Sequence, residues 1–303
     1  MKFRKLAALG LAAAMSAGLM LTGCSSQGQE KKTFTIAYAP NESTEQSVDA
    51  RQGLAKDLQE VLGMEVKEIQ ASDYNAIIEA LRTGKADMAY MGPLAVALAV
   101  DRADAQPVVM KAPQGDKAQA VYRSVLIARS DNTGINSIAD IRGKTMAFVD
   151  PDSTSGNLIP TAEIINAFPD DKLDSDLLHT NGAFFEAVSF SGKHQAGLQA
   201  VIKGDVDVAP ISDQILASEI ANGNAGKSDI KVIFESGDIP AEAMVVGKGV
   251  DSALREKLVG FLTGYQNEEY FTKVIKVEGA RFVECGVQDY QSIIELNDII
   301  NAQ

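Results

Sequence analysis

Short apolar stretches alternate with longer amphipathic stretches along most of this chain, and this alternation limits the possible folds more than any other feature. Residues 34–38 form an apolar strand-like run, residues 45–62 carry apolar side chains at helical spacing, and residues 64–69 alternate again as a strand. A strand, a helix and a second strand at this spacing form a right-handed βαβ unit on a mainly parallel sheet. The sequence therefore predicts an α/β fold.

The same pattern restarts in the middle of the chain, which indicates a second lobe. A buried-looking apolar run at 124–129 is followed by further strands, and a helix is predicted between two of them. The predicted strands cover residues 144–149, 187–190 and 206–209, and the helix covers 194–203.

We predict a two-lobed fold in which both chain ends build one lobe. Residues 33–124 plus 243–303 are expected to form lobe 1, mostly helical from residue 252 onward, and residues 125–242 are expected to form lobe 2. The runs 124–129 and 240–246 are predicted to cross between the lobes and to act as a hinge. Ligands of α/β sheets bind at the carboxyl ends of the strands, which here predicts a ligand cleft between the lobes.

Two segments, 81–89 and 201–209, resemble each other. Each has the end of a helix, a glycine, an acidic residue and an apolar strand in that order. The likeness has two explanations: two lobes of the same topology, or the common order of helix, turn and strand in α/β proteins.

The first residues have the composition of an export signal. Lys2, Arg4 and Lys5 form a basic start, and residues 6–21 are uncharged and apolar. This apolar run is short for a membrane span but suits the central part of a signal peptide.

The segment that follows, Leu21-Thr22-Gly23-Cys24, resembles a bacterial lipobox. We therefore predict that residues 1–23 are a lipoprotein signal peptide, that Cys24 carries lipid (palmitate among its acyl chains), and that the polar residues 24–32 are a flexible tether. This would anchor the mature protein at the extracytoplasmic face of the bacterial cell membrane. An ordinary signal peptide with an incidental cysteine is the alternative.

Composition limits the possible partners of the mature chain of about 280 residues. Cys285 is the only cysteine besides Cys24, so lipidation of Cys24 leaves no intramolecular disulfide. The net charge is −13 and no block of basic residues occurs, which argues against nucleic acid as a partner. An acidic protein can still bind an anion, because a pocket acts through local dipoles and hydrogen bonds.

A run of hydroxyl side chains, Ser153-Thr154-Ser155-Gly156, follows the predicted strand 144–149 and precedes a predicted helix. Backbone N–H groups at the start of a helix have no partners within it, and the helix dipole adds partial positive charge there. Together with the hydroxyls they would suit a tetrahedral oxyanion. The alternative is that Ser153 or Thr154 merely caps the helix.

Enzyme motifs are absent from the sequence. It has no G-x-S-x-G, H-E-x-x-H or G-x-x-x-x-G-K-[ST] pattern. Two histidines, His179 and His194, and one unlipidated cysteine are too few for a typical metal site. A serine nucleophile would need a base, and His194 is the only credible one. We therefore predict a protein without catalytic activity, metal or cofactor.

Several short motifs occur in the order found in one family: ASDY at 71–74, YMGPL at 90–94, DPDSTSG at 150–156, SGKH at 191–194 and GDVDVA at 204–209. In these motifs the chain resembles the solute-binding proteins of phosphonate, phosphite and phosphate ABC transporters, from about Thr33 to about Phe282. The resemblance implies a periplasmic-binding-protein fold of type II, with a hinge and a ligand cleft between the lobes.

The resemblance also implies which residues contact the ligand. Ser153, Thr154, Ser155, Tyr74 and His194 match positions that hold the phosphonate oxygens. Glu242 matches an acidic residue that receives the amino group of an aminoalkylphosphonate. Two departures concern the organic tail of the ligand: Met91 stands where some relatives have tyrosine, and neutral Gln214, next to Asp213, stands near a position that is glutamate in some relatives.

The resemblance implies a monomeric solute-binding lipoprotein that delivers a small phosphorus oxyanion to the permease and ATPase subunits of an ABC importer. Two alternatives stay open. A receptor of the same fold could take a sulfonate, and a ligand-sensing lipoprotein could report to a membrane receptor instead of a permease.

Overall fold

The computed structural model describes residues 33–42 and 45–302. The predicted signal peptide 1–23, the lipidation site Cys24 and the tether 24–32 lie outside these residues. Within the described part of the chain, no helix is long and apolar enough to cross a membrane.

A six-stranded sheet forms the core of one lobe, with the strand order β13-β4-β12-β3-β1-β2. Strands β1, β2 and β3 are parallel, while β12 and β13 run antiparallel to their neighbours. The strands are β1 (Thr33–Tyr38), β2 (Glu65–Gln70), β3 (Met88–Met91), β4 (Gln106–Pro113), β12 (Ala243–Val246) and β13 (Ala280–Glu284).

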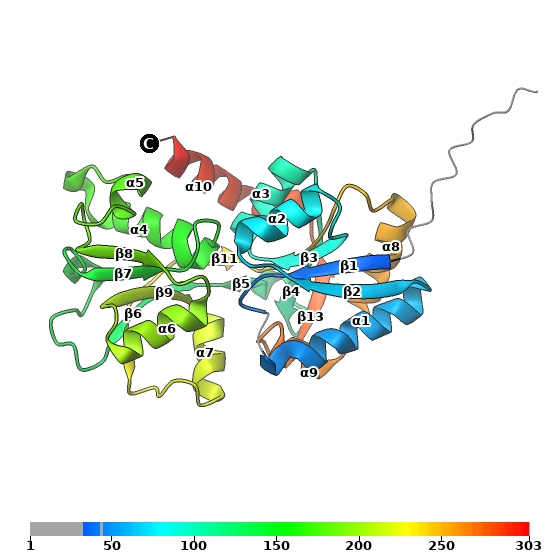
Figure 1. The fold of residues 1–303 in the computed structure, drawn as a ribbon, viewed down its shortest axis with the longest axis horizontal. Coiled ribbons are helices and arrows are strands. Elements are labelled where there is room, and N and C mark those ends of the chain that lie inside the picture. The colour runs from blue at the N-terminus through cyan, green and yellow to red at the C-terminus, as the bar shows by residue number, and fades with distance from the viewer. Residues whose placement is uncertain (1–32, 43–44, 303) are drawn as a thin grey trace, which may run out of the picture. The chain divides into compact units, whose positions relative to one another are not determined.

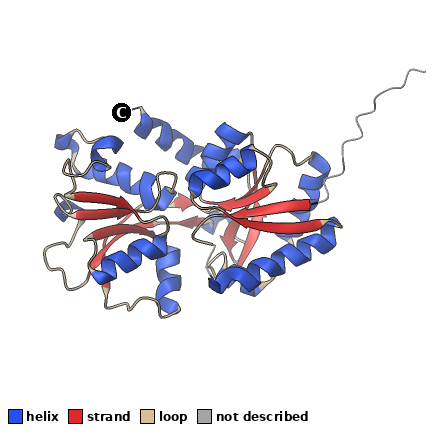
Figure 2. Cartoon of the chain, viewed as in Figure 1, coloured by secondary structure: helices blue, strands red, loops and turns tan. Residues whose placement is uncertain are grey.

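Helices cover both faces of this sheet, as Figures 1 and 2 show. Alternate residues of β1 point to opposite faces: Phe34 and Ile36 pack with α1, α8 and α9, whereas Ala37 packs with α2, α3 and α10. The helices are α1 (Val48–Leu62), α2 (Tyr74–Arg82), α3 (Pro93–Ala103), α8 (Ser252–Thr263), α9 (Glu268–Lys273) and α10 (Gln291–Asn301).

A five-stranded sheet, in the order β10-β6-β9-β7-β8, forms the core of the other lobe. Helices α4 and α5 lie on one face and α6 and α7 on the other (Figure 1). The elements are β6 (Ser124–Arg129), β7 (Thr145–Phe148), β8 (Ala187–Phe190), β9 (Val208–Ser212), β10 (Ile230–Glu235), α4 (Ile159–Ala167), α5 (Ser175–Leu178), α6 (His194–Lys203) and α7 (Asp213–Ala221).

The two lobes repeat one topology. The order β1-α1-β2-α2-β3 in the first lobe corresponds to β7-α4-β8-α6-β9 in the second, and β1 and β7 each lie between their two parallel partners. Asp87 exchanges hydrogen bonds with the backbone of Thr35, and Asp207 does the same with Thr145. The likeness between segments 81–89 and 201–209 therefore reflects equivalent places in two similar lobes.

The structure corrects the predicted crossing at 124–129. This segment is β6, a strand inside the second sheet that pairs with β9 and β10. The chain passes between the sheets at β5 (Val121–Tyr122) and β11 (Ile239–Pro240), which pair with each other, and β12 already belongs to the first sheet.

Two strands of the first sheet were missing from the sequence prediction. Strand β4 was not recognised, and the region after residue 252, predicted as mostly helical, also contains β13. Both sheets are also more mixed than expected, because β12 and β13 in one sheet and β6 in the other run against their neighbours.

Candidate functional site

A small cavity lies where the carboxyl ends of strands from both lobes meet, as predicted for the ligand cleft. The space open to the centre of a water-sized sphere measures about 20 Å³. Its lining is mostly polar and comes from both lobes: Ala39, Asn41, Glu42, Tyr74, Gly92, Tyr122, Ser153, Thr154, Ser155, His194, Ile215 and Glu242.

The hydroxyl run forms the turn between β7 and α4, and its side chains are buried. Ser153 caps the helical turn Thr154–Leu158, because its Oγ accepts a hydrogen bond from the Gly156 N–H at 3.2 Å. Gly156 has no room for a side chain, since an added Cβ would lie 2.4 Å from the side chain of Val149. Capping thus accounts for Ser153, but it does not account for the hydroxyls of Thr154 and Ser155.

Thr154 connects this turn to the first lobe. Its Oγ1 accepts a hydrogen bond of 2.8 Å from the backbone N–H of Leu94, in the first turn of α3, where such groups have no partner within the helix. A hydroxyl whose oxygen accepts in this way keeps its hydrogen to donate elsewhere. The Tyr122 hydroxyl lies within hydrogen-bonding reach of Thr154 and Ser155.

Both the backbone carbonyl and the side chain of Ser155 have polar neighbours. Ser124, at the start of β6, donates its hydroxyl to the Ser155 carbonyl at 2.7 Å. The Ser155 Oγ lies 3.4 Å from His194 Nε2. Burial lowers the pKa of His194 to about 4, so its ring is neutral at neutral pH and can donate from one nitrogen only.

Tyr74 and His194 occupy equivalent positions in the two lobes, each as the first residue of the helix that follows an edge strand. Asn41 joins them: its Oδ1 accepts from the His194 backbone N–H at 3.1 Å, and its Nδ2 donates to the Tyr74 hydroxyl. The Tyr74 hydroxyl also lies within reach of Ser153. Burial raises the pKa of Tyr74 well above its usual value, so Tyr74 stays a donor.

Two carboxylates line the cavity, and each lies near a lysine. Glu242 forms an ion pair with Lys111, with Oε2 and Nζ 2.6 Å apart. Burial raises the pKa of Glu42 to about 8, although the charge of Lys276 opposes this rise. Burial also lowers the pKa of Lys276.

Six of the eight predicted contact residues line the cavity together, namely Tyr74, Ser153, Thr154, Ser155, His194 and Glu242. Met91 and Asp213 do not. Met91 ends β3 within the apolar core of the first lobe, and the Asp213 carboxylate accepts from the backbone N–H groups of Arg123 and Gln214.

Asn41, Glu42 and Tyr122 line the cavity but were not recognised in the sequence. Asn41 and Glu42 follow β1, at the position that corresponds to the hydroxyl turn after β7, so the lobe repeat is the signal that points to them. Nothing in the local sequence marks Tyr122, which lies where the chain passes between the sheets.

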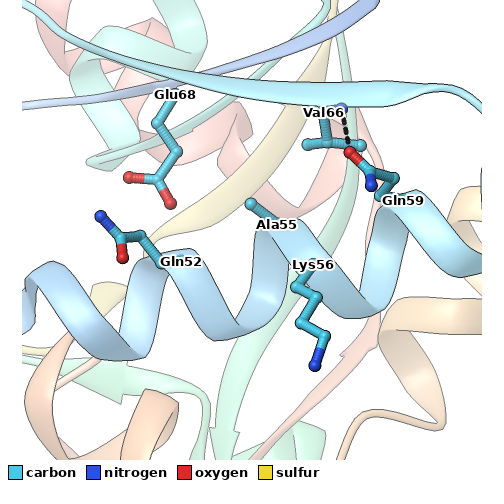
Figure 3. A pocket seen from close by; sticks show the side chains of 6 residues that line it. All are labelled: Gln52, Ala55, Lys56, Gln59, Val66 and Glu68. Atoms are coloured by element: carbon cyan, nitrogen blue, oxygen red, sulfur yellow. Dashed lines mark hydrogen bonds between the residues drawn. The ribbon is translucent and has the colours of Figure 1, made fainter.

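A larger and more open groove lies between α1 and β2, away from the hydroxyl turn (Figure 3). In it the Gln59 side chain accepts a hydrogen bond from the Val66 N–H, and Lys56 points away from β2. The two glutamines, the lysine and Glu68 of this groove do not converge on a common point, so it is a weaker candidate for the ligand site.

Among the described residues, no group of three or more histidines, cysteines or carboxylates could hold a metal ion.

Comparison with known proteins gives one consistent result. Residues 36–290 match the family model described as "ABC transporter, phosphonate, periplasmic substrate-binding protein". The chain is 29% identical to the phosphate-import protein PhnD of Mycolicibacterium smegmatis over 258 residues, which cover 81% of this chain and 78% of that protein.

Solved structures agree with the type II fold predicted from the resemblance. A binding protein component of an ABC phosphonate transporter from Pseudomonas aeruginosa superposes with a TM-score of 0.76 and 25% identity, covering 88% of this chain and 86% of the other. PhnD1 from Prochlorococcus marinus, in complex with methylphosphonate, superposes with a TM-score of 0.73 and 19% identity. The match covers 89% of this chain and 98% of the other. The two-lobed α/β fold of type II is confirmed.

Proposed function

The chain belongs to the family of periplasmic substrate-binding proteins of phosphonate ABC transporters, and from this premise we propose that it binds a small phosphorus oxyanion in the cavity between its lobes and delivers it to a permease. The proposal takes phosphonate, phosphite and phosphate as the ligand class. It includes Ser153, Thr154, Ser155, Tyr74 and His194 as the residues that contact the oxygens.

The convergence of buried hydrogen-bond donors on one point carries the proposal. The hydroxyl turn, both tyrosines and His194 line the same cavity, and Thr154 and Tyr74 each have an oxygen that already accepts from a protein N–H group. Donors whose positions are fixed before binding lose little freedom when the ligand arrives. A small oxyanion is the ligand that matches this group of donors, and the charge of Glu242 at the same cavity is compensated by Lys111.

The number of donors suffices for tight binding. A dissociation constant of 1 μM corresponds to about 8 kcal/mol. A hydrogen bond to a charged group contributes about 1.5–3 kcal/mol. The three hydroxyls of the turn, both tyrosines and His194 therefore exceed about 8 kcal/mol before the costs of ordering and desolvation are subtracted.

The remaining parts of the proposal concern movement and location. Sheet membership supports the division into 33–124 plus 243–303 and 125–242, with β5 and β11 as the connection about which the lobes would rotate. The lipobox-like segment supports a lipid anchor on Cys24. Replacement of Cys24 by serine in the native host should move the protein from the membrane fraction to the soluble fraction.

Binding calorimetry with methylphosphonate, phosphite, phosphate and the sulfonate taurine tests the ligand class. We expect the wild type to bind at least one phosphorus oxyanion and not to bind taurine. The Ser155→Ala variant should remain folded and bind the best ligand at least tenfold more weakly. Ser252→Ala, at an exposed serine that begins α8, is the matched control and should bind as the wild type does. Equal affinities of wild type and Ser155→Ala would refute the assignment of the site.

A further inference from the structure

A buried lysine lies against the cavity without belonging to its lining. Lys111 is in the middle of β4 and is only 3% exposed. Its ammonium lies 2.6 Å from the Glu242 carboxylate and 5.7 Å from the centre of the Tyr122 ring. Since Glu242 and Tyr122 both line the cavity, the charge of Lys111 is fixed at the cavity wall.

The backbone holds this pair in register. The Lys111 N–H donates to the Glu242 carbonyl at 3.1 Å, which places the two residues side by side where β4 meets the segment before β12. Because Lys111 is buried beside the partly buried Glu242 and the partner is supplied by the protein itself, the Glu242 carboxylate already has its counter-charge before any ligand enters.

The other lining carboxylate cannot replace Glu242 as a partner for a cation. Burial raises the pKa of Glu42 to about 8, so it is mostly uncharged at neutral pH. A ligand ammonium that enters the cavity would therefore lose its hydration without forming an ion pair with a free carboxylate. Burying such an unpaired charge is costly.

We propose that Lys111 is a specificity-determining residue, because its ammonium neutralises Glu242 and leaves no unpaired carboxylate for a ligand's amino group. The site then selects small phosphorus oxyanions without a cationic tail and disfavours aminoalkylphosphonates. This inference rests on the proposed function and narrows its ligand class.

The test compares two ligands by calorimetry, methylphosphonate and 2-aminoethylphosphonate. The wild type should bind methylphosphonate at least tenfold more tightly. Lys111→Ala removes the competing ammonium and opens space beside Glu242, so the ratio of the two dissociation constants should shift at least tenfold toward 2-aminoethylphosphonate. The double variant Lys111→Ala/Glu242→Gln lacks the carboxylate and should lose this shift.

Further variants separate a change of selectivity from damage to the fold. Lys111→Met keeps much of the side-chain volume while removing the charge, and it should shift the ratio in the same direction. Lys117→Ala, at an exposed lysine paired with Asp289, should leave the ratio unchanged. In thermal unfolding, the stabilisation by 2-aminoethylphosphonate relative to that by methylphosphonate should be larger for Lys111→Ala than for the wild type.

The outcomes distinguish the two proposals. If phosphonates bind but the wild type prefers 2-aminoethylphosphonate, or if neither Lys111 variant shifts the ratio, the role of Lys111 is refuted and the proposed function stands. If the wild type binds none of the phosphorus oxyanions, the proposed function fails, and the role of Lys111 fails with it.

Discussion

Thr154 offers the sharpest test of how the site works, because its hydroxyl has two roles. Its oxygen accepts from the Leu94 N–H at the start of α3, which joins the lobes, and its hydrogen is available to the ligand. Replacement by valine keeps the shape of the side chain and removes both hydrogen bonds. The Thr154→Val variant should therefore lose ligand affinity without a large change in packing.

The loss can be estimated from the two bonds. A hydrogen bond to a charged oxygen contributes about 1.5–3 kcal/mol, which corresponds to a loss of affinity of about 10-fold to 150-fold. The Leu94 N–H also loses its partner when the lobes are together, which costs about 1–3 kcal/mol if no water replaces it. Both effects weaken binding, so the measured loss should reach at least about tenfold.

Titration calorimetry with the tightest-binding phosphorus oxyanion measures this loss, and thermal unfolding without ligand shows whether the variant is folded. Thr154→Ser keeps the hydroxyl and lacks only a methyl group, so its affinity should stay within about threefold of the wild type. An affinity of Thr154→Val within the same range would show that the Thr154 hydroxyl contributes nothing to binding, and the reasoning on the hydroxyl turn would be refuted.

Three further predictions concern stability and pH. In Gly156→Ala the added Cβ would overlap Val149, so the free energy of unfolding in urea should fall by about 1–3 kcal/mol or more. In the control Gly237→Ala no atom lies within 4 Å of the added Cβ, so the free energy of unfolding should hardly change. Glu42 has a folded pKa of about 8 against an ordinary value of 4.5, so the folded form retains a proton that the unfolded chain releases, and stability falls as pH rises between these values. Glu42→Gln should remove this fall in pH-dependent thermal unfolding, while the same change at exposed Glu45 should not. Because burial lowers the pKa of His194 to about 4, His194→Ala should weaken binding by a similar factor, about tenfold, at pH 6 and at pH 8; a calorimetric loss confined to pH 6 would contradict a neutral ring.

Local sequence signals predicted the elements that carry most of the site. The helix predicted at 194–203 is α6, His194–Lys203, and the glycine after it has the positive φ that ends a helix. The Gly92-Pro93 pair begins α3, because proline suits a first helical position. Such starts and ends are encoded by neighbouring residues, so a single sequence reveals them.

Contacts between distant segments could not be predicted in the same way. Strand β4 has proline near both ends and a lysine in its middle, so it lacks the continuous apolar pattern of a buried strand. The buried Lys111 side chain is paired with Glu242, which comes from a distant part of the chain. Asn41 likewise gains its role from His194 and Tyr74, which the fold brings to it.

The chemistry of the cavity wall also bears on ionic strength. Its donors are hydroxyls, an amide and a neutral ring, and the nearby Lys111 charge is compensated by Glu242. Dissolved ions screen exposed charges strongly and buried dipoles weakly. The chain has a net charge of −13, so dissolved ions also reduce the repulsion between the protein and an incoming anion. If the cavity binds an anion as proposed, its affinity should therefore depend only weakly on ionic strength.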